Sequence, residues 1–235
     1  MEINADFSRR VVIHGGDLPW IASPQPGVER RLFDRIGDEV ARATSLVRYS
    51  PGSTFKSHTH GGGEEFFVLE GAFADEHGTY PTGSYVRNPP TSSHTPSVPL
   101  GCTIFVKLWQ MAPDDRIKVR LHADDLATRS WTAARPGVEE KALFVDSDEN
   151  VRLERWSSNT RVETPVAARG GLELLVLEGS FELAGGSGGM LSVTSWLREP
   201  EGAPPLVATA GPVGCALWVK SGHSARRREA PVLLP

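Results

Sequence analysis

Short apolar runs separated by turn residues recur along the whole chain. They are rich in Val, Phe, Leu and Thr, and Gly, Pro, Asn and Ser interrupt them about every 8 to 12 residues, which is typical of a sandwich or barrel. Residues 27–43 show some apolar positions at helical spacing, but internal glycines favour strand and turn there. The clearest strands of the first half are expected at residues 44–53, 64–73, 78–90 and 102–110. The pattern predicts an all-β fold.

The chain also contains an internal repeat. Four segments of the first half recur in the same order in the second: VIHGGDL as RLHADDL, PGVERRLF as PGVEEKALF, FFVLEGAF as LLVLEGSF, and GCTIFVK as GCALWVK. The offset grows from 108 residues between Val12 and Arg120 to 113 residues between Gly101 and Gly214, as loop insertions would make it. Each copy has about 110 residues, a common domain size. We therefore expect one domain at residues 1–112 and a second at residues 113–235.

Composition and charge argue against several classes of partner. The formal net charge is -4 and the pI is near 6.0, so the chain offers no basic field for nucleic acid. No segment reaches the roughly 18 apolar residues of a membrane helix, and the amino terminus is too polar for a secretory signal. Cys102 and Cys215 occupy equivalent positions of the repeat and are expected to be buried thiols. We expect a cytoplasmic protein that binds neither nucleic acid nor membrane, and a homodimer is left open.

A polar segment, His58 to Glu65, interrupts the predicted strands of the first half. Side chains two residues apart on a strand share a face, so His58 and His60 should project together. Three glycines then allow the backbone to turn, which brings Glu64 or Glu65 toward both imidazoles. Imidazole nitrogens with a carboxylate oxygen suit iron, manganese, nickel or zinc. The segment therefore predicts a divalent metal site.

The second copy of the repeat distinguishes the candidate ligands from residues of the fold. Glu65 recurs as Glu173 in a half without the histidines, and we assign it to the fold. Four polar residues of the first copy are replaced together in the second: His58 by Val166, His60 by Ala168, Glu64 by Leu172 and His94 by Pro205. Because they are lost together, we predict that His58, His60, Glu64 and His94 hold one divalent metal per chain in the first domain, and that the second domain holds none.

Other polar and aromatic residues are weaker candidates. Phe66 shares the strand parity of Glu64 and should face the same cavity, although an aromatic side chain at such a position more often serves core packing. Lys107 and Arg87 recur in the second copy, as Lys220 and Arg198, and are assigned to the fold. No separate acid or base can be named, so no catalytic residue is assigned beyond the metal ligands.

These residues resemble the two motifs of the cupin superfamily. The first motif is Gly, five residues, His-x-His, three or four residues, Glu, six residues, Gly, and its places are filled by Gly52, His58, His60, Glu64 and Gly71. In the second motif Thr91 and Val98 replace a glycine and an asparagine, whereas Gly83, Pro89 and His94 match. The surrounding sequence is similar to the ChrR-like cupin family, closely in the first half and as a degenerate copy in the second.

The resemblance implies a bicupin, with two tandem jelly-roll β-barrels and a metal in the first only. Family members include the zinc-bound sensor half of an anti-sigma factor, and related cupins include dioxygenases that cleave diketones and hydroxyketones. We expect a non-haem Fe(II)-type dioxygenase acting on a small enolisable ketone or diketone. The alternative is a zinc-binding sensor without activity, and a sugar isomerase or epimerase also suits the fold.

The same family raises the question of a sigma-factor partner. An anti-sigma factor of that kind would carry a helical, zinc-holding domain before its cupin. This chain begins its first barrel almost immediately and has no cysteine before Cys102. Sigma-factor binding is therefore not expected, and a small molecule is the expected partner.

Overall fold

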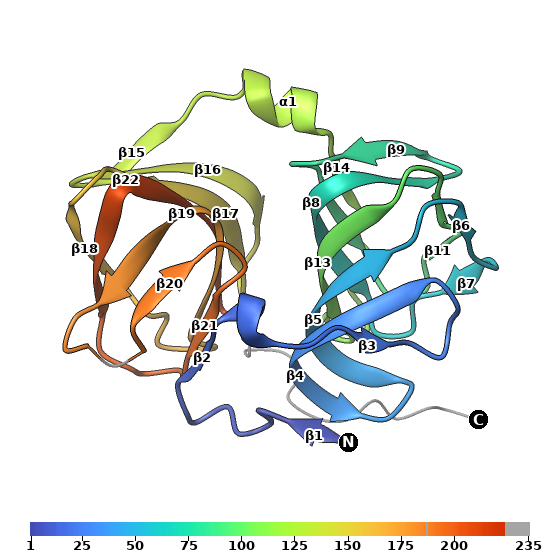
Figure 1. The fold of residues 1–235 in the computed structure, drawn as a ribbon, viewed down its shortest axis with the longest axis horizontal. Coiled ribbons are helices and arrows are strands. Elements are labelled where there is room, and N and C mark those ends of the chain that lie inside the picture. The colour runs from blue at the N-terminus through green and yellow to red at the C-terminus, as the bar shows by residue number, and fades with distance from the viewer. Residues whose placement is uncertain (187, 224–235) are drawn as a thin grey trace. The chain divides into compact units, whose positions relative to one another are not determined.

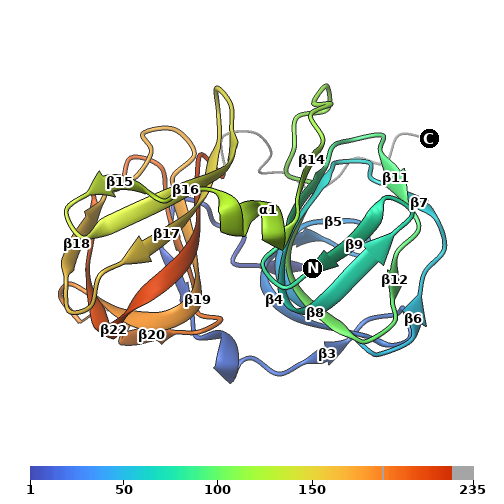
Figure 2. The same cartoon turned by 90° about the horizontal axis from the view of Figure 1, so that it is seen from above.

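The computed structural model describes residues 1–186 and 188–223, and these are built almost entirely of β-strands (Figure 1). They divide into two compact units. Unit 1 contains residues 1–5 and 19–128, and unit 2 contains residues 6–18, 129–186 and 188–223. In Figures 1 and 2 the strands of each unit curl around an interior of their own. The all-β prediction is confirmed.

Unit 1 has one main antiparallel sheet with the strand order β1-β4-β5-β13-β8-β10-β14, while β7 and β11 form a separate pair. Its sequence ends in one short helix, α1 (Ala123–Thr128). The strands are β1 (Glu2–Ile3), β3 (Ile21–Ala22), β4 (Val28–Gly37), β5 (Ala41–Tyr49), β6 (Ser53–Thr54), β7 (His58–Thr59), β8 (Glu64–Asp75), β9 (Gly78–Pro81), β10 (Tyr85–Asn88), β11 (Ser93–His94), β12 (Ser97–Val98), β13 (Cys102–Leu108) and β14 (Val119–Leu121). Residues 27–43 supply β4 and the start of β5, as the internal glycines indicate.

Unit 2 repeats this architecture with the strand order β15-β16-β17-β22-β19-β21-β2. Its elements are β2 (Val11–Ile13), the 3-10 turn η1 (Gly15–Asp17), β15 (Thr132–Arg135), β16 (Val138–Val145), β17 (Asn150–Trp156), β18 (Arg161–Thr164), β19 (Leu172–Leu183), β20 (Met190–Ser192), β21 (Trp196–Glu199) and β22 (Leu206–Ser221). The series β4-β5-β13-β8-β10-β14 thus corresponds to β16-β17-β22-β19-β21-β2. The sequence repeat is a repeat of structure.

The last strand of each sheet comes from the other half of the sequence. β2 lies near the start of the chain but pairs with β21 in unit 2, whereas β14 follows the first repeat's strands and pairs with β10 in unit 1. The compact units therefore include residues 6–18 in unit 2 and residues 113–128 in unit 1. The predicted boundary at residue 112 refers to the sequence duplication, and it stays a prediction.

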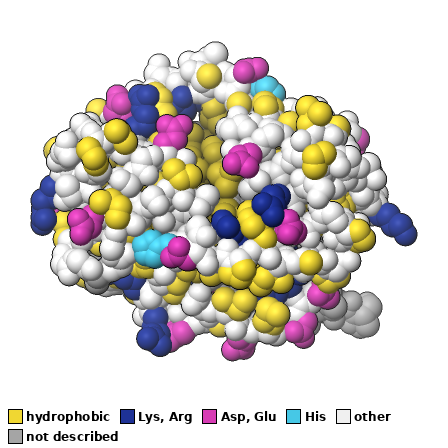
Figure 3. Space-filling view, in the orientation of Figure 1, with side chains coloured by type: hydrophobic (Ala, Val, Ile, Leu, Met, Phe, Trp, Pro, Cys, Tyr) yellow, Lys and Arg dark blue, Asp and Glu magenta, His cyan; other side chains and the backbone are white. Residues whose placement is uncertain are grey.

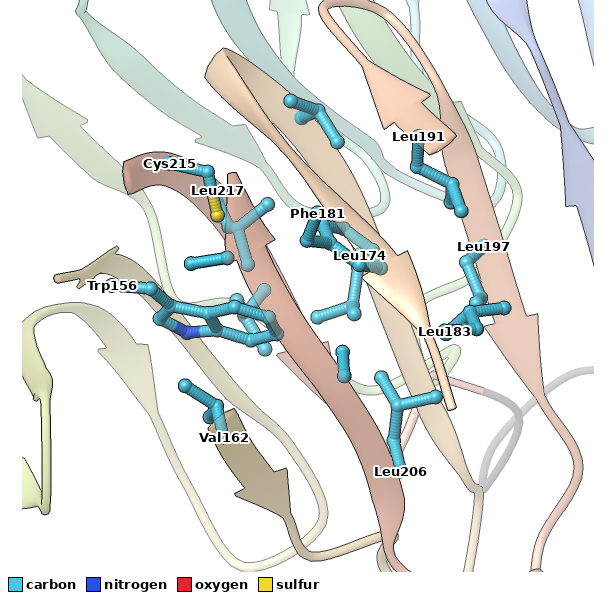
Figure 4. Close-up of a cluster of buried hydrophobic side chains, with 14 of the residues drawn as sticks. Trp156, Val162, Leu174, Phe181, Leu183, Leu191, Leu197, Leu206, Cys215 and Leu217 are labelled. Atoms are coloured by element: carbon cyan, nitrogen blue, oxygen red, sulfur yellow. The ribbon is translucent and has the colours of Figure 1, made fainter. Parts of the chain in front are cut away.

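The interior of unit 2 is filled by hydrophobic side chains (Figure 4). Leu172, the residue in place of Glu64, is fully buried, and Trp156 packs against Phe181 with ring centroids 5.2 Å apart. Val166, in place of His58, packs against the same cluster. Each fully buried side chain of this size contributes about 1.5–3 kcal/mol to stability. Hydrophobic side chains therefore occupy the positions in unit 2 that correspond to His58 and Glu64.

Three further features bear on the expectations from composition: the surface charges, the two cysteines and the helices. Lys, Arg, Asp and Glu side chains are interspersed on the face in Figure 3. Cys102 and Cys215 are buried free thiols, and burial raises the pKa of each to about 12. Within residues 1–186 and 188–223, no helix has the length and hydropathy needed to span a membrane.

Candidate metal centre

The four predicted ligands converge in unit 1, where His58 is exposed and the other three are buried. Pairing of β7 with β11 places His58 opposite His94, His60 follows β7, and Glu64 opens β8. The ligand atoms of these four side chains all lie within 4.8 Å of one another. The three imidazole rings have centroids 4.7 to 5.0 Å apart. Residues from three strands therefore form one compact cluster.

The triple glycine between His60 and Glu64 is held against the residues that follow β13. The Trp109 N–H donates to the Gly63 carbonyl at 3.0 Å, and the Met111 N–H donates to the Gly62 carbonyl at 3.2 Å. A Cβ on Gly62 would lie only 2.4 Å from the Trp109 ring. The glycines allow this close packing, which fixes the separation of His60 from Glu64.

Replacing Gly62 with Ala is expected to weaken metal binding about 10-fold and to destabilise the protein by about 1–3 kcal/mol. Overpacking has costs of this size, and displacement of the loop would move Glu64. Metal titration and thermal unfolding measure the two effects. Gly16→Ala is the control, because a Cβ on Gly16 would meet no atom within 4 Å. Equal affinity and stability of Gly62→Ala and wild type would contradict the role of the loop.

The cluster contains polar atoms that a cation would satisfy. His60 Nε2 and His94 Nε2 are buried and have no hydrogen-bond partner among the described residues. They lie 3.7 Å and 3.6 Å from the same oxygen, Oε2 of Glu64. Buried polar atoms without partners are rare, and a divalent cation about 2 Å from each atom would satisfy all three. The donor set fits a transition metal or zinc.

The electrostatic environment keeps the buried imidazoles neutral. Burial lowers the pKa of His60 to about 4, and the charge of His58 acts in the same direction. Burial also lowers the pKa of His94, although Glu64 opposes that shift. Metals bind the neutral imidazole. Both side chains are therefore ready to bind a metal at neutral pH without losing a proton first.

The lowered pKa of His60 predicts that the metal-free protein loses stability in acid. The unfolded chain binds a proton at this residue below pH 6.5, whereas the folded protein does so only near pH 4, so stability falls as the pH decreases between these values. The contribution of His60 reaches about 3 kcal/mol at the acid end of this window. Urea unfolding of EDTA-treated protein at pH 7 and pH 4.5 measures it. A His60→Ala variant should show a smaller loss, and an equal loss would contradict the assignment.

Neighbouring polar groups orient the ligands. Asn88 lies opposite Glu64 in the β8–β10 pair, and its amide donates to Glu64 Oε2 at 3.1 Å. His58 Nδ1 lies 3.3 Å from the Lys56 carbonyl, and His94 Nδ1 lies 3.2 Å from Asp75 Oδ2. Such contacts fix the ring orientation of ligating histidines. Sequence reasoning missed Asn88 and Asp75, although the second repeat replaces both of them.

A cavity of about 640 Å³ opens onto the cluster. Its lining includes three of the four candidate ligands, His58, Glu64 and His94, together with Gln25, Val28, Tyr49, Thr54, Phe55, Lys56, Ser57, Phe73 and Pro96. Phe66 is not among them. It belongs to the hydrophobic core of unit 1, and its ring packs against Phe73 at 4.8 Å. Of the two explanations for Phe66, core packing holds.

The residues assigned to the fold are held by buried contacts, and the glutamate contact is of the same kind in both units. Glu65 accepts a hydrogen bond from the Tyr85 hydroxyl at 2.6 Å, and Glu173 accepts one from Trp196 Nε1 at 2.7 Å. Lys107 donates to the Thr44 hydroxyl at 2.9 Å. These contacts are structural and lie outside the cavity lining.

Comparison with known proteins finds a similar domain family and supports the fold. Residues 8–112 match the model of the ChrR Cupin-like domain. No curated protein is significantly similar to the chain in sequence.

Three solved structures illustrate the fold. A protein of Nostoc punctiforme with a proposed dioxygenase activity is similar with a TM-score of 0.72 and 15% identity, over 97% of this chain and 88% of that chain. The pirin YhhW of Escherichia coli, in complex with nickel(II), has a TM-score of 0.63 and 13% identity over 91% and 99%. Oxalate decarboxylase of Lactobacillus farciminis, in a formate complex, has a TM-score of 0.61 and 11% identity over 90% and 86%. This chain therefore has the cupin fold, and its residues 8–112 are similar to the ChrR Cupin-like domain.

Proposed function

We propose that the protein is a metal-dependent enzyme, a non-haem Fe(II)-type dioxygenase that acts on a small enolisable ketone or diketone. One observation carries this proposal: the cluster of three histidines and one glutamate borders a cavity large enough for a small molecule. His58, His60, Glu64 and His94 would hold the metal. A metal bound there would supply Lewis-acid polarisation of a carbonyl oxygen and redox chemistry with dioxygen.

The cavity favours an enzyme over a closed structural site. A structural zinc site has four protein ligands in a tetrahedron and no open position. An ion that accepts six ligands keeps two positions for a substrate after binding four protein groups. Because the candidate ligands border the cavity, a small molecule can reach them.

The cavity wall indicates the class of substrate. Val28, Phe55 and Phe73 supply an apolar surface, and the Tyr49 ring packs edge-on against both phenylalanines, at 5.4 Å and 5.9 Å. Burial raises the pKa of Tyr49, with a further contribution from the charge of Glu64. Its hydroxyl therefore stays protonated and can donate to a substrate oxygen. A small carbonyl compound with an apolar body matches this lining.

Metal analysis and oxygen uptake test the proposal together. Protein purified without added metal is analysed for iron, zinc, manganese and nickel, and then assayed with dioxygen and a panel of β-diketones and hydroxyketones. Bound iron and substrate-dependent oxygen uptake support the enzyme, and His60→Ala should abolish the uptake. Tightly held zinc without turnover would instead support the sensor. Conversion of a substrate without oxygen uptake would also exclude a dioxygenase.

A further inference from the structure

A chain of hydrogen bonds leads from β14 to one of the candidate ligands. Arg120 Nε donates to the Tyr80 hydroxyl at 3.0 Å, and this hydroxyl donates to Asp75 Oδ1 at 3.3 Å. The other carboxylate oxygen, Asp75 Oδ2, lies within hydrogen-bond distance of His94 Nδ1, at 3.2 Å. The Asp75 side chain is fully buried, and the backbone N–H of His77 donates to its Oδ1 at 2.8 Å. Both oxygens of the carboxylate are therefore hydrogen-bonded.

The chain is built on paired strands. Asp75 ends β8, and Tyr80 lies on β9, which pairs with β8 so that Tyr80 is opposite Phe73. Arg120 lies on β14, opposite Val86 of β10. Side chains on paired strands are positioned more exactly than those on loops. The carboxylate of Asp75 is thus held in one place relative to His94.

Unit 2 has apolar residues at all three equivalent positions. β8 and β19 are each 12 residues long, so Asp75 corresponds to Leu183. Tyr80 corresponds to Leu191, which pairs with Phe181. Arg120 corresponds to Val12, which pairs with Leu197. All three apolar side chains belong to the core of unit 2 or pack against it, and Figure 4 shows Leu183 and Leu191 in that core.

Comparing which hydrogen bonds of unit 1 also occur in unit 2 distinguishes contacts that serve the candidate metal site from contacts that serve the fold. The hydrogen bond from Tyr85 to Glu65 has a counterpart in unit 2, from Trp196 to Glu173, as expected for a contact that serves the fold. The chain from Arg120 to Asp75 has no such counterpart and is absent from the unit that lacks the candidate ligands. A purely structural chain would have no reason to disappear with the histidines.

We propose that Asp75, held by Tyr80 and Arg120, is a positioning residue of the metal centre. Its carboxylate fixes His94 as the Nδ1–H tautomer, which leaves the lone pair of Nε2 directed at His60 and Glu64. This assignment rests on the proposed metal binding. Ligating histidines commonly donate their second ring N–H to a carboxylate, and loss of that partner weakens metal affinity by about 10–100-fold.

The variants Asp75→Leu and Asp75→Asn test this role. Asp75→Leu copies the residue of unit 2, and Asp75→Asn changes the shape of the side chain least. Zinc(II) affinity is measured by competition with a chelator, and the tautomer of His94 in the metal-free protein is read from long-range ¹H–¹⁵N NMR. We expect affinity to fall about 10–100-fold in Asp75→Leu and less in Asp75→Asn. The Nδ1–H tautomer should dominate in wild type and lose its dominance in Asp75→Leu.

Glu70→Gln is the matched control, because Glu70 is an exposed acid of the same strand, β8, and accepts from the Thr103 hydroxyl at 3.3 Å. It should bind zinc within about twofold of wild type. Tyr80→Phe removes one hydroxyl and should show a smaller loss in the same direction, even if both Asp75 variants fail to fold. Unchanged affinity and an unchanged His94 tautomer in folded variants would overturn the proposal. If wild type itself binds no metal, the proposed function fails, whereas the tautomer measurement still decides whether Asp75 positions His94.

Discussion

Replacing His60 with Ala should abolish metal binding and leave the fold intact. The Nε2 atom of His60 is buried without a partner among the described residues, so the metal-free protein loses no hydrogen bond there. The metal affinity should fall by more than about 100-fold, because loss of a group that only hydrogen-bonds to a ligating residue already lowers it by about 10–100-fold. At a metal concentration 100 times the Kd, wild type gains about 2.7 kcal/mol of stability that the variant cannot gain.

Calorimetric unfolding with and without zinc measures this difference, and metal analysis of the purified proteins measures occupancy. His77→Ala is the control, because His77 is an exposed histidine of the same unit. It should retain the metal and the metal-dependent rise in Tm. If His60→Ala keeps both, the cluster is not the metal site. A variant that melts far below metal-free wild type would show that His60 serves the fold.

Exchanging the residues at the equivalent positions Glu64 and Leu172 should have opposite consequences in the two units. Leu172→Glu places a carboxyl group in a core without imidazole partners, which should cost about 2 to 7 kcal/mol. That loss corresponds to a fall in Tm of about 4 to 28 °C for a protein of this size. Glu64→Leu should abolish metal binding but change the stability of the metal-free protein by less than about 2 kcal/mol, because its carboxylate borders the cavity.

Thermal unfolding of both variants in EDTA, with metal titration of each, checks this contrast. Leu172→Met is the control for the second unit, because it keeps the volume and apolar character of the side chain and should cost less than about 1.5 kcal/mol. Similar destabilisation by Glu64→Leu and Leu172→Glu would mean that the two interiors have the same role. Metal binding gained by Leu172→Glu would contradict the assignment of unit 2 as a core.

The four candidate ligands could be predicted because His58, His60 and Glu64 are close in sequence and all four, His94 included, differ between the repeats. His58 and His60 are two residues apart, so a strand places their side chains on the same face. Leu172 replaces Glu64 in the second copy whereas Glu65 is kept, which favours Glu64 as the ligand. The all-β fold was equally accessible, since turn residues mark the ends of the strands. Comparison of equivalent positions in the two copies distinguished the candidate ligands from residues of the fold, which a single copy would not have allowed.

Other features depend on contacts that are distant in sequence. Asp75 reaches His94 across 19 positions, and Tyr49 reaches the cavity from a strand that carries no motif. Asp75 could have been found by extending the comparison of repeats to the end of β8, where Leu183 replaces it. Trp109 gave no such signal, because its role lies in the space it fills beside Gly62. Packing of this kind is set by the fold as a whole.

The exchange of β2 and β14 between the halves of the sequence limits how the gene can be divided. A fragment that stops at residue 112 would lack β14, so β10 would present an unpaired edge prone to aggregation. It would also lack Arg120, the outermost member of the hydrogen-bonded chain to His94. Because each main sheet takes its last strand from the other half of the sequence, neither half alone contains every strand of either sheet.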